Sequence, residues 1–110
     1  MHISQKLRIA SQLLDEIDGI SRVEKKPEVI HAYFGELVLT MVYGHNKYAY
    51  IIRRGSEKLC WWDDRPHHPL VRTHPHHFHP SENEPPVESK MIGDPTSDIP
   101  NLLKFIKHKV

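Results

Sequence analysis

The strongest constraint on the fold is the shortness of the links in the middle of the chain. Between about residues 28 and 62 the hydrophobic pattern alternates as in half-buried strands, and only short, turn-prone links interrupt it. A link such as Gly44-His45-Asn46 can join only antiparallel neighbours. The pattern therefore predicts an antiparallel meander with strands at Glu28–Phe34, Glu36–Tyr43, Lys47–Arg54 and Lys58–Trp62.

A helix is predicted on each side of this meander. Residues 3–18 carry apolar side chains at steps of three and four, and Gly19 provides a natural stop. The chain from about Ser97 has a similar apolar face, with Ser97 or Asp98 as the N-cap and Pro100 in the first turn. Both ends of the chain are therefore expected to be helical.

The whole chain, residues 1–110, is predicted to form a single α+β domain. An antiparallel meander of four to five strands would be flanked by the two helices, with Pro86–Glu88 as a short edge strand. Both faces of the sheet carry apolar residues: Leu39 and Met41 point to one side and Val38 and Val42 to the other. We therefore expect helices on one face and a partner, or a homodimer, on the other.

Composition excludes several classes of protein. The only cysteine, Cys60, rules out an internal disulfide and a cysteine-based zinc site. No apolar run approaches the roughly 20 residues that span a bilayer, and the N-terminus lacks the apolar region of a signal peptide. There is no phosphate-cradling glycine loop, which argues against a nucleotide-hydrolysing enzyme. We expect a cytoplasmic protein with no membrane partner.

The most unusual stretch is residues 61–80, which reads WWDDRPHHPLVRTHPHHFHP. Six of the ten histidines of the chain lie here, interleaved with four prolines. Proline favours extended, non-helical backbone, and histidine offers a group that exchanges protons near neutral pH or binds a metal. We call residues 61–80 the histidine segment and expect it to carry the functional site. Its histidines are His67, His68, His74, His76, His77 and His79.

One interpretation of this segment is acid–base catalysis on RNA. One imidazole would take the proton of a 2′-hydroxyl and another would protonate the leaving oxygen, each contributing roughly 100- to 10,000-fold in rate. Asp63 or Asp64 would hold an imidazole in one tautomer, while Arg65 and Arg72 would stabilise phosphate charge. Arg53 lies near a turn beside this segment and is a further candidate for phosphate contact. This chemistry requires no metal or other cofactor.

Two other interpretations remain open. A transition metal such as zinc would be bound by imidazoles drawn from His74, His76, His77 and His79, with a third ligand from another histidine or an aspartate. The spacing matches no established zinc signature, however. In the third interpretation the segment is a surface loop that is merely rich in histidine, anchored to the core by Trp61 and Trp62. As a function, the alternative to catalysis is a metal-binding or protein-interaction domain that uses the same histidines.

The histidine segment also resembles a known family. The order Trp62-Asp63-Asp64-Arg65-Pro66-His67-His68, followed after six residues by Pro75-His76-His77-Phe78-His79, is similar to the TumE-like toxins of prokaryotic type II toxin–antitoxin systems. The family pattern usually has asparagine where this chain has Asp64. The resemblance implies a toxin neutralised by a cognate antitoxin, which often has a helix-turn-helix domain. It also implies site residues at Asp63, His67, His68, His76, His77 and His79.

These arguments lead to one hypothesis. The protein is expected to be a toxin that acts on RNA, with ribonuclease activity as the favoured but open enzymatic assignment. The catalytic candidates are His67, His68, His76 and His77, with Asp63 orienting one of them. The substrate-binding candidates are Arg53, Arg65, Arg72 and His79. The sequence does not assign the acid and the base among them.

Overall fold

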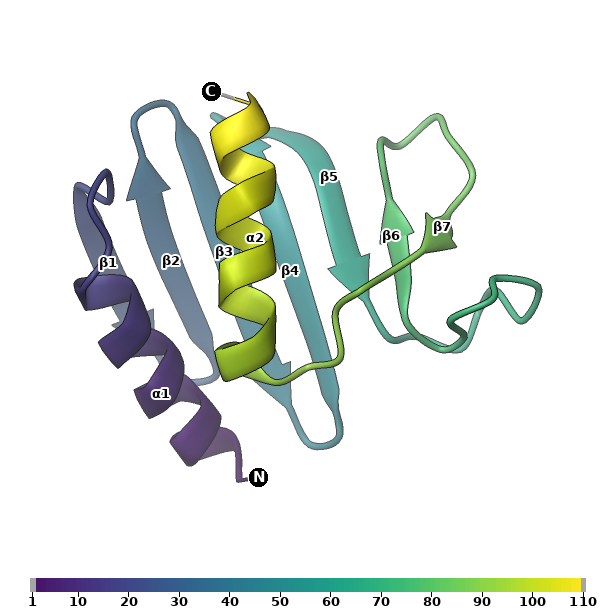
Figure 1. The fold of residues 1–110 in the computed structure, drawn as a ribbon, viewed down its shortest axis with the longest axis horizontal. Coiled ribbons are helices and arrows are strands. Elements are labelled where there is room, and N and C mark those ends of the chain that lie inside the picture. The colour runs from purple at the N-terminus through teal and green to yellow at the C-terminus, as the bar shows by residue number, and fades with distance from the viewer. Residues whose placement is uncertain (1, 110) are drawn as a thin grey trace.

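The computed structural model describes residues 2–109 and has two layers, one β-sheet and two helices that lie on the same face of it (Figure 1). The sheet contains seven strands in the order in which they occur in the chain, and each pairs antiparallel with the next. The elements are α1 (Ile3–Asp15), β1 (Arg22–Lys26), β2 (Val29–Phe34), β3 (Leu37–Gly44), β4 (Lys47–Arg54), β5 (Glu57–Asp63), β6 (His77–His79), β7 (Val87–Glu88) and α2 (Pro95–Lys109).

The predicted class and the meander are confirmed, and the sheet extends further than expected on both sides. β1 precedes the four predicted strands, while β6 and β7 follow them. β7 is the short edge strand expected at residues 86–88. β6 lies inside the histidine segment, so this segment leaves β5, forms a loop and then returns to pair with β5. Six residues of the histidine segment, three at the end of β5 and three in β6, are therefore placed by the hydrogen bonds of the sheet.

The core lies between the sheet and the helices. Leu39, Met41 and Tyr50 of the central strands are at most 1% exposed, as are Leu14 of α1 and Leu102 of α2. Burying a side chain of this size stabilises the fold by roughly 1.5–3 kcal/mol. The residues between them in β3 and β4 point to the face that the helices do not cover, which we call the open face, and most of these are only half-buried.

Both helix boundaries differ from the prediction. α1 ends at Asp15 rather than near residue 18, and His2 and Gln5 form a capping box at its start. α2 begins at Pro95 rather than at Ser97, because Asp94 accepts hydrogen bonds from the residues that follow and Pro95 suits the first helical position. No helix within residues 2–109 is long and apolar enough to cross a membrane.

Asp98 is a buried anchor of α2 rather than its N-cap. It is fully buried and accepts hydrogen bonds from the hydroxyl of Tyr50 at 2.6 Å and from the backbone N–H groups of Gly93 at 2.7 Å and Ile92 at 3.0 Å. Tyr43 extends this network through its hydroxyl, which lies 3.0 Å from that of Tyr50. Burial raises the pKa of Asp98 above its usual value, although the three hydrogen bonds act in the opposite direction.

Candidate functional site

The pairing of β5 with β6 places part of the histidine segment on the open face. Trp62 and Phe78 are opposite one another in the ladder, stack at 4.6 Å, and both contact Phe105 of α2. Because side chains alternate along a strand, the neighbours of Trp62 and Phe78 point away from the helices. Trp61, Asp63, His77 and His79 therefore lie together on the open face.

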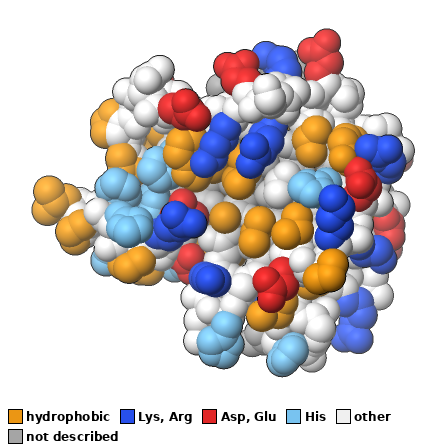
Figure 2. Space-filling model, turned by 180° about the vertical axis from the view of Figure 1, so that it is seen from behind, with side chains coloured by type: hydrophobic (Ala, Val, Ile, Leu, Met, Phe, Trp, Pro, Cys, Tyr) orange, Lys and Arg blue, Asp and Glu red, His pale blue; other side chains and the backbone are white. Residues whose placement is uncertain are grey.

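His68 reaches this group from the loop between β5 and β6. Its ring centroid lies 4.9 Å from that of His77 and 5.6 Å from that of His79, and the last two rings are 4.7 Å apart. We call His68, His77, His79 and Asp63 the open-face cluster. In Figure 2, which views the molecule from the side opposite the helices, histidine side chains gather at one end of the face beside a row of hydrophobic residues and several basic ones.

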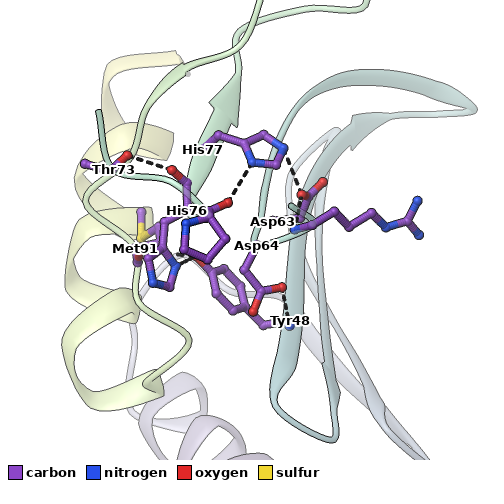
Figure 3. A network of polar contacts seen from close by, with 9 residues as sticks. Tyr48, Asp63, Asp64, Thr73, His76, His77 and Met91 are labelled. Atoms are coloured by element: carbon purple, nitrogen blue, oxygen red, sulfur yellow. Dashed lines mark hydrogen bonds and ion pairs between the residues drawn. The ribbon is translucent and has the colours of Figure 1, made fainter. Parts of the chain in front are cut away.

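Asp63 and His77 form a buried pair at the base of the cluster. His77 is 2% exposed, and its Nε2 lies 2.9 Å from Oδ1 of Asp63 (Figure 3). Its Nδ1 donates a hydrogen bond of 2.9 Å to the carbonyl of Pro75. Since the carbonyl can only accept, Nδ1 carries the hydrogen of this bond, and Nε2 faces the carboxylate. The backbone N–H of Arg65 also donates to Oδ1 of Asp63, at 3.0 Å.

His79 lies in a more open environment. Its ring stacks on Trp61 with centroids 4.4 Å apart, and the ammonium of Lys58 lies 3.7 Å from the centroid of the same indole. Partial burial, and next the neighbouring His77, lower the pKa of His79, which favours its neutral form. Within residues 2–109, no hydrogen bond involves the ring nitrogens of His68 or His79. These two imidazoles have nitrogens available to a ligand.

The structure separates His76 from the cluster. His76 precedes β6 and points to the side of the helices, where its Nδ1 lies 2.8 Å from the hydroxyl of Tyr48 (Figure 3). That hydroxyl donates to the carbonyl of Met91 at 3.1 Å, so the Nδ1–H of His76 is the donor to Tyr48. Asp64 also lies away from the cluster and accepts a hydrogen bond from the backbone N–H of Tyr48. His76 and His77 therefore cannot act on the same bound group.

The other predicted residues surround the cluster at different distances. The ring of His67 is 6.4 Å from that of His68, and His67 and His74 are both exposed. Arg53 pairs with Lys58 in the ladder and extends the basic edge of the open face. The guanidinium of Arg72 is bound to Glu88 at 2.6 Å, which offsets its charge. A hollow of about 490 Å³ lies beside the cluster, lined by His67, His68, Pro69, Leu70, Val71, Arg72, Pro86, Val87 and Glu88.

Sequence reasoning missed three groups that shape the site. These are the carbonyl of Pro75, which holds His77, the indole of Trp61, which supports His79, and the hydroxyl of Tyr48, which binds His76. A backbone carbonyl leaves no signal in the sequence, and the two aromatic contacts depend on strand register. One ligand atom from each of His68, His77 and His79 lies within 4.8 Å of the others, close enough for the three to hold a metal ion.

Comparison with known protein families gives a match. The family model described as Toxin TumE matches residues 13–110. The chain belongs to the TumE toxin family. The match covers the whole sheet, the histidine segment and α2, so the resemblance expected from the histidine segment is confirmed. Membership of the TumE family makes this chain a toxin of a toxin–antitoxin system and implies a cognate antitoxin as its partner. No curated protein and no solved structure matched the chain.

Proposed function

We propose that this toxin acts on RNA as a metal-independent ribonuclease, and that His68 and His79 are its acid–base pair. The observation that carries the proposal is that two imidazoles with unbonded ring nitrogens converge beside the buried Asp63–His77 pair on an accessible face. Acid–base catalysis needs two such groups within reach of one phosphodiester. His76 does not belong to this pair, because its Nδ1 is bound to Tyr48 on the helix side of the sheet.

The reaction would proceed without a cofactor. A neutral imidazole takes the proton of the 2′-hydroxyl, whose oxygen attacks phosphorus while the bond to the 5′-oxygen breaks. The second imidazole, in its protonated form, gives its proton to that leaving oxygen. Each proton transfer contributes roughly 100- to 10,000-fold in rate. The buried Asp63–His77 pair is a positioning element. It joins β5 to β6, the strand from which His79 projects.

Basic groups near the cluster fit a phosphate backbone. Lys58 and Arg53 lie side by side at the edge of the open face next to Trp61, and Arg65 is exposed two residues after Asp63. Such groups would neutralise the phosphate charge that grows in the transition state. Arg72 would contribute only after leaving Glu88, so we rank it below Lys58 and Arg53.

The test is expression in a bacterium under tight control, with growth and total RNA integrity followed after induction. Wild type should arrest growth and cleave RNA, whereas a His68→Ala/His79→Ala variant should do neither. A His45→Ala/His74→Ala variant is the matched control, because both histidines are exposed and lie outside the cluster. Far-UV circular dichroism verifies that all three proteins fold.

The same proteins should then be assayed on RNA in vitro with excess EDTA. Cleavage by wild type that persists in EDTA supports the metal-independent mechanism. Intact RNA after growth arrest would reject the ribonuclease assignment. Full activity of the His68→Ala/His79→Ala variant would reject His68 and His79 as the acid–base pair. Cleavage abolished by EDTA would reject the metal-independent mechanism.

A further inference from the structure

We propose that His68, His77, His79 and Asp63 form a binding site for one divalent transition-metal ion of the zinc class. The proposal does not depend on the reaction proposed above, since it concerns binding alone. It rests on three histidines whose ligand atoms lie close together, on the carboxylate of Asp63 that contacts one of them, on the orientation of His77, and on the access that the open face provides.

The donor groups match a zinc site in type: three histidines lie close enough to share an ion, and Asp63 contacts His77 beside them. Zinc in proteins is bound by imidazole nitrogens and carboxylate oxygens, with four ligands in tetrahedral arrangement. Candidate ligand atoms of the three histidines lie within 4.8 Å of one another. Nε2 of His77 and Oδ1 of Asp63 are 2.9 Å apart. Two ligands on bonds of about 2.0–2.1 Å in a tetrahedral site are about 3.3 Å apart, so that pair needs only a small adjustment.

The hydrogen bond to Pro75 orients His77 as a ligand. A metal-bound histidine almost always donates its other N–H to a carbonyl or carboxylate, which fixes the tautomer and directs the free nitrogen at the metal. Nδ1 of His77 donates to the carbonyl of Pro75, and Nε2 faces Asp63. The side of His77 that faces Asp63 is therefore the side that can bind a cation.

The remaining two ligands are free to move onto an ion. His68 and His79 are half-buried, and no hydrogen bond within residues 2–109 holds their ring nitrogens. The stacking of His79 on Trp61 limits the directions in which its ring turns.

An ion in this site would occupy the nitrogens that acid–base catalysis requires. A bound zinc ion and imidazole catalysis by His68 and His79 therefore exclude one another. If both proposals hold, zinc inhibits the RNA cleavage, and EDTA restores it. If only the metal site exists, zinc binds and no RNA is cleaved under any condition.

The test is isothermal titration calorimetry with zinc chloride on untagged protein that has been stripped with EDTA and dialysed. Wild type should bind about one ion per chain, and His68→Ala and His79→Ala, which each remove a direct ligand, should weaken binding by more than the roughly 10–100-fold that loss of an outer-shell partner costs. Magnesium chloride should give no binding, because magnesium prefers oxygen ligands. His67→Ala is the matched control, since this exposed neighbour of His68 is not a member of the cluster.

Three results would overturn the proposal. One is absence of zinc binding by wild type. Another is equal weakening by His67→Ala, which would indicate unspecific binding to a histidine-rich loop. The third is unchanged zinc affinity in a folded His68→Ala/His79→Ala variant. Thermal unfolding with and without zinc provides a second measurement, because an ion bound only by the folded state raises the melting temperature.

Discussion

His76 and His77 are neighbours in the chain, and the structure places them in opposite environments. His76 lies on the helix side, where it belongs to a chain of hydrogen bonds with Tyr48 and Met91. His77 lies on the open face beside two histidines whose nitrogens remain available. The same residue type therefore stabilises the fold at one position and contributes to an accessible site at the next. Strand register, rather than residue type, decides which role each histidine has.

The two sides of the sheet should accordingly respond to mutation in opposite ways. On the helix side each polar group of the Asp98 network has a partner within the protein, so a change there should affect stability. On the open face the cluster is supported by the sheet below it, so a change in His68 should affect binding and chemistry. The predictions below test this contrast and are ordered by the size of their expected effect on stability.

The largest loss of stability is expected for Asp98→Asn. Asparagine keeps one accepting oxygen but places an amide donor where Oδ2 accepts from Tyr50 and Gly93. Losing a hydrogen bond to a charged acceptor in a buried site costs about 1.5–3 kcal/mol. Urea unfolding at neutral pH should show this loss. Zinc affinity should be unchanged, because Asp98 lies on the helix side of the sheet.

The pH dependence of the stability of wild type and Asp98→Asn provides a sharper check. Because the pKa of Asp98 is raised in the folded state, its protonation stabilises the fold fully below the ordinary pKa of 3.8, and this contribution is lost as pH rises through the raised value. The advantage of wild type over Asp98→Asn should therefore shrink as pH increases from about 4. An advantage that grows over this range would contradict the assigned direction.

A smaller loss of stability is expected for Tyr48→Phe. The change removes the hydroxyl that donates to Met91 and accepts from His76, and it keeps the aromatic ring in place. A neutral hydrogen bond contributes about 0.5–1.5 kcal/mol, and the half-buried His76 can partly recover its bond through water. Urea unfolding should show a loss of this size, with unaltered RNA cleavage. If Tyr48→Phe abolished cleavage at full stability, His76 would have to be assigned to the active site.

Much of the fold followed from the sequence because hydrophobic periodicity and link length are local signals. The four central strands, both helices and the short edge strand at residues 86–88 were predicted on these grounds. β6 was missed because His77–His79 has little hydrophobic alternation and becomes a strand only by pairing with β5. β1 was missed for a similar reason: most of Arg22–Lys26 is charged, and pairing with β2 determines its conformation.

The site was only partly predictable for the same physical reason. Residue types identified the histidine segment and Asp63 as the place where the chemistry should occur. They did not separate His76 from His77, since both belong to the motif and differ only in the face to which the strand directs them. Nor did they show that Asp64 bonds the backbone of Tyr48 rather than an imidazole. Long-range pairing determines each of these contacts.

The smallest effect on stability is expected for His68→Ala. Its ring contacts other imidazoles from a loop, and no hydrogen bond within residues 2–109 holds its nitrogens, so the free energy of unfolding should change by no more than about 0.5 kcal/mol. Loss of one acid–base group should nevertheless lower RNA cleavage by about 100-fold or more. Both quantities should be measured on the same preparation, beside Tyr48→Phe. A variant that lost stability as Asp98→Asn does and retained cleavage would make the cluster a structural element and reverse the contrast between the two faces.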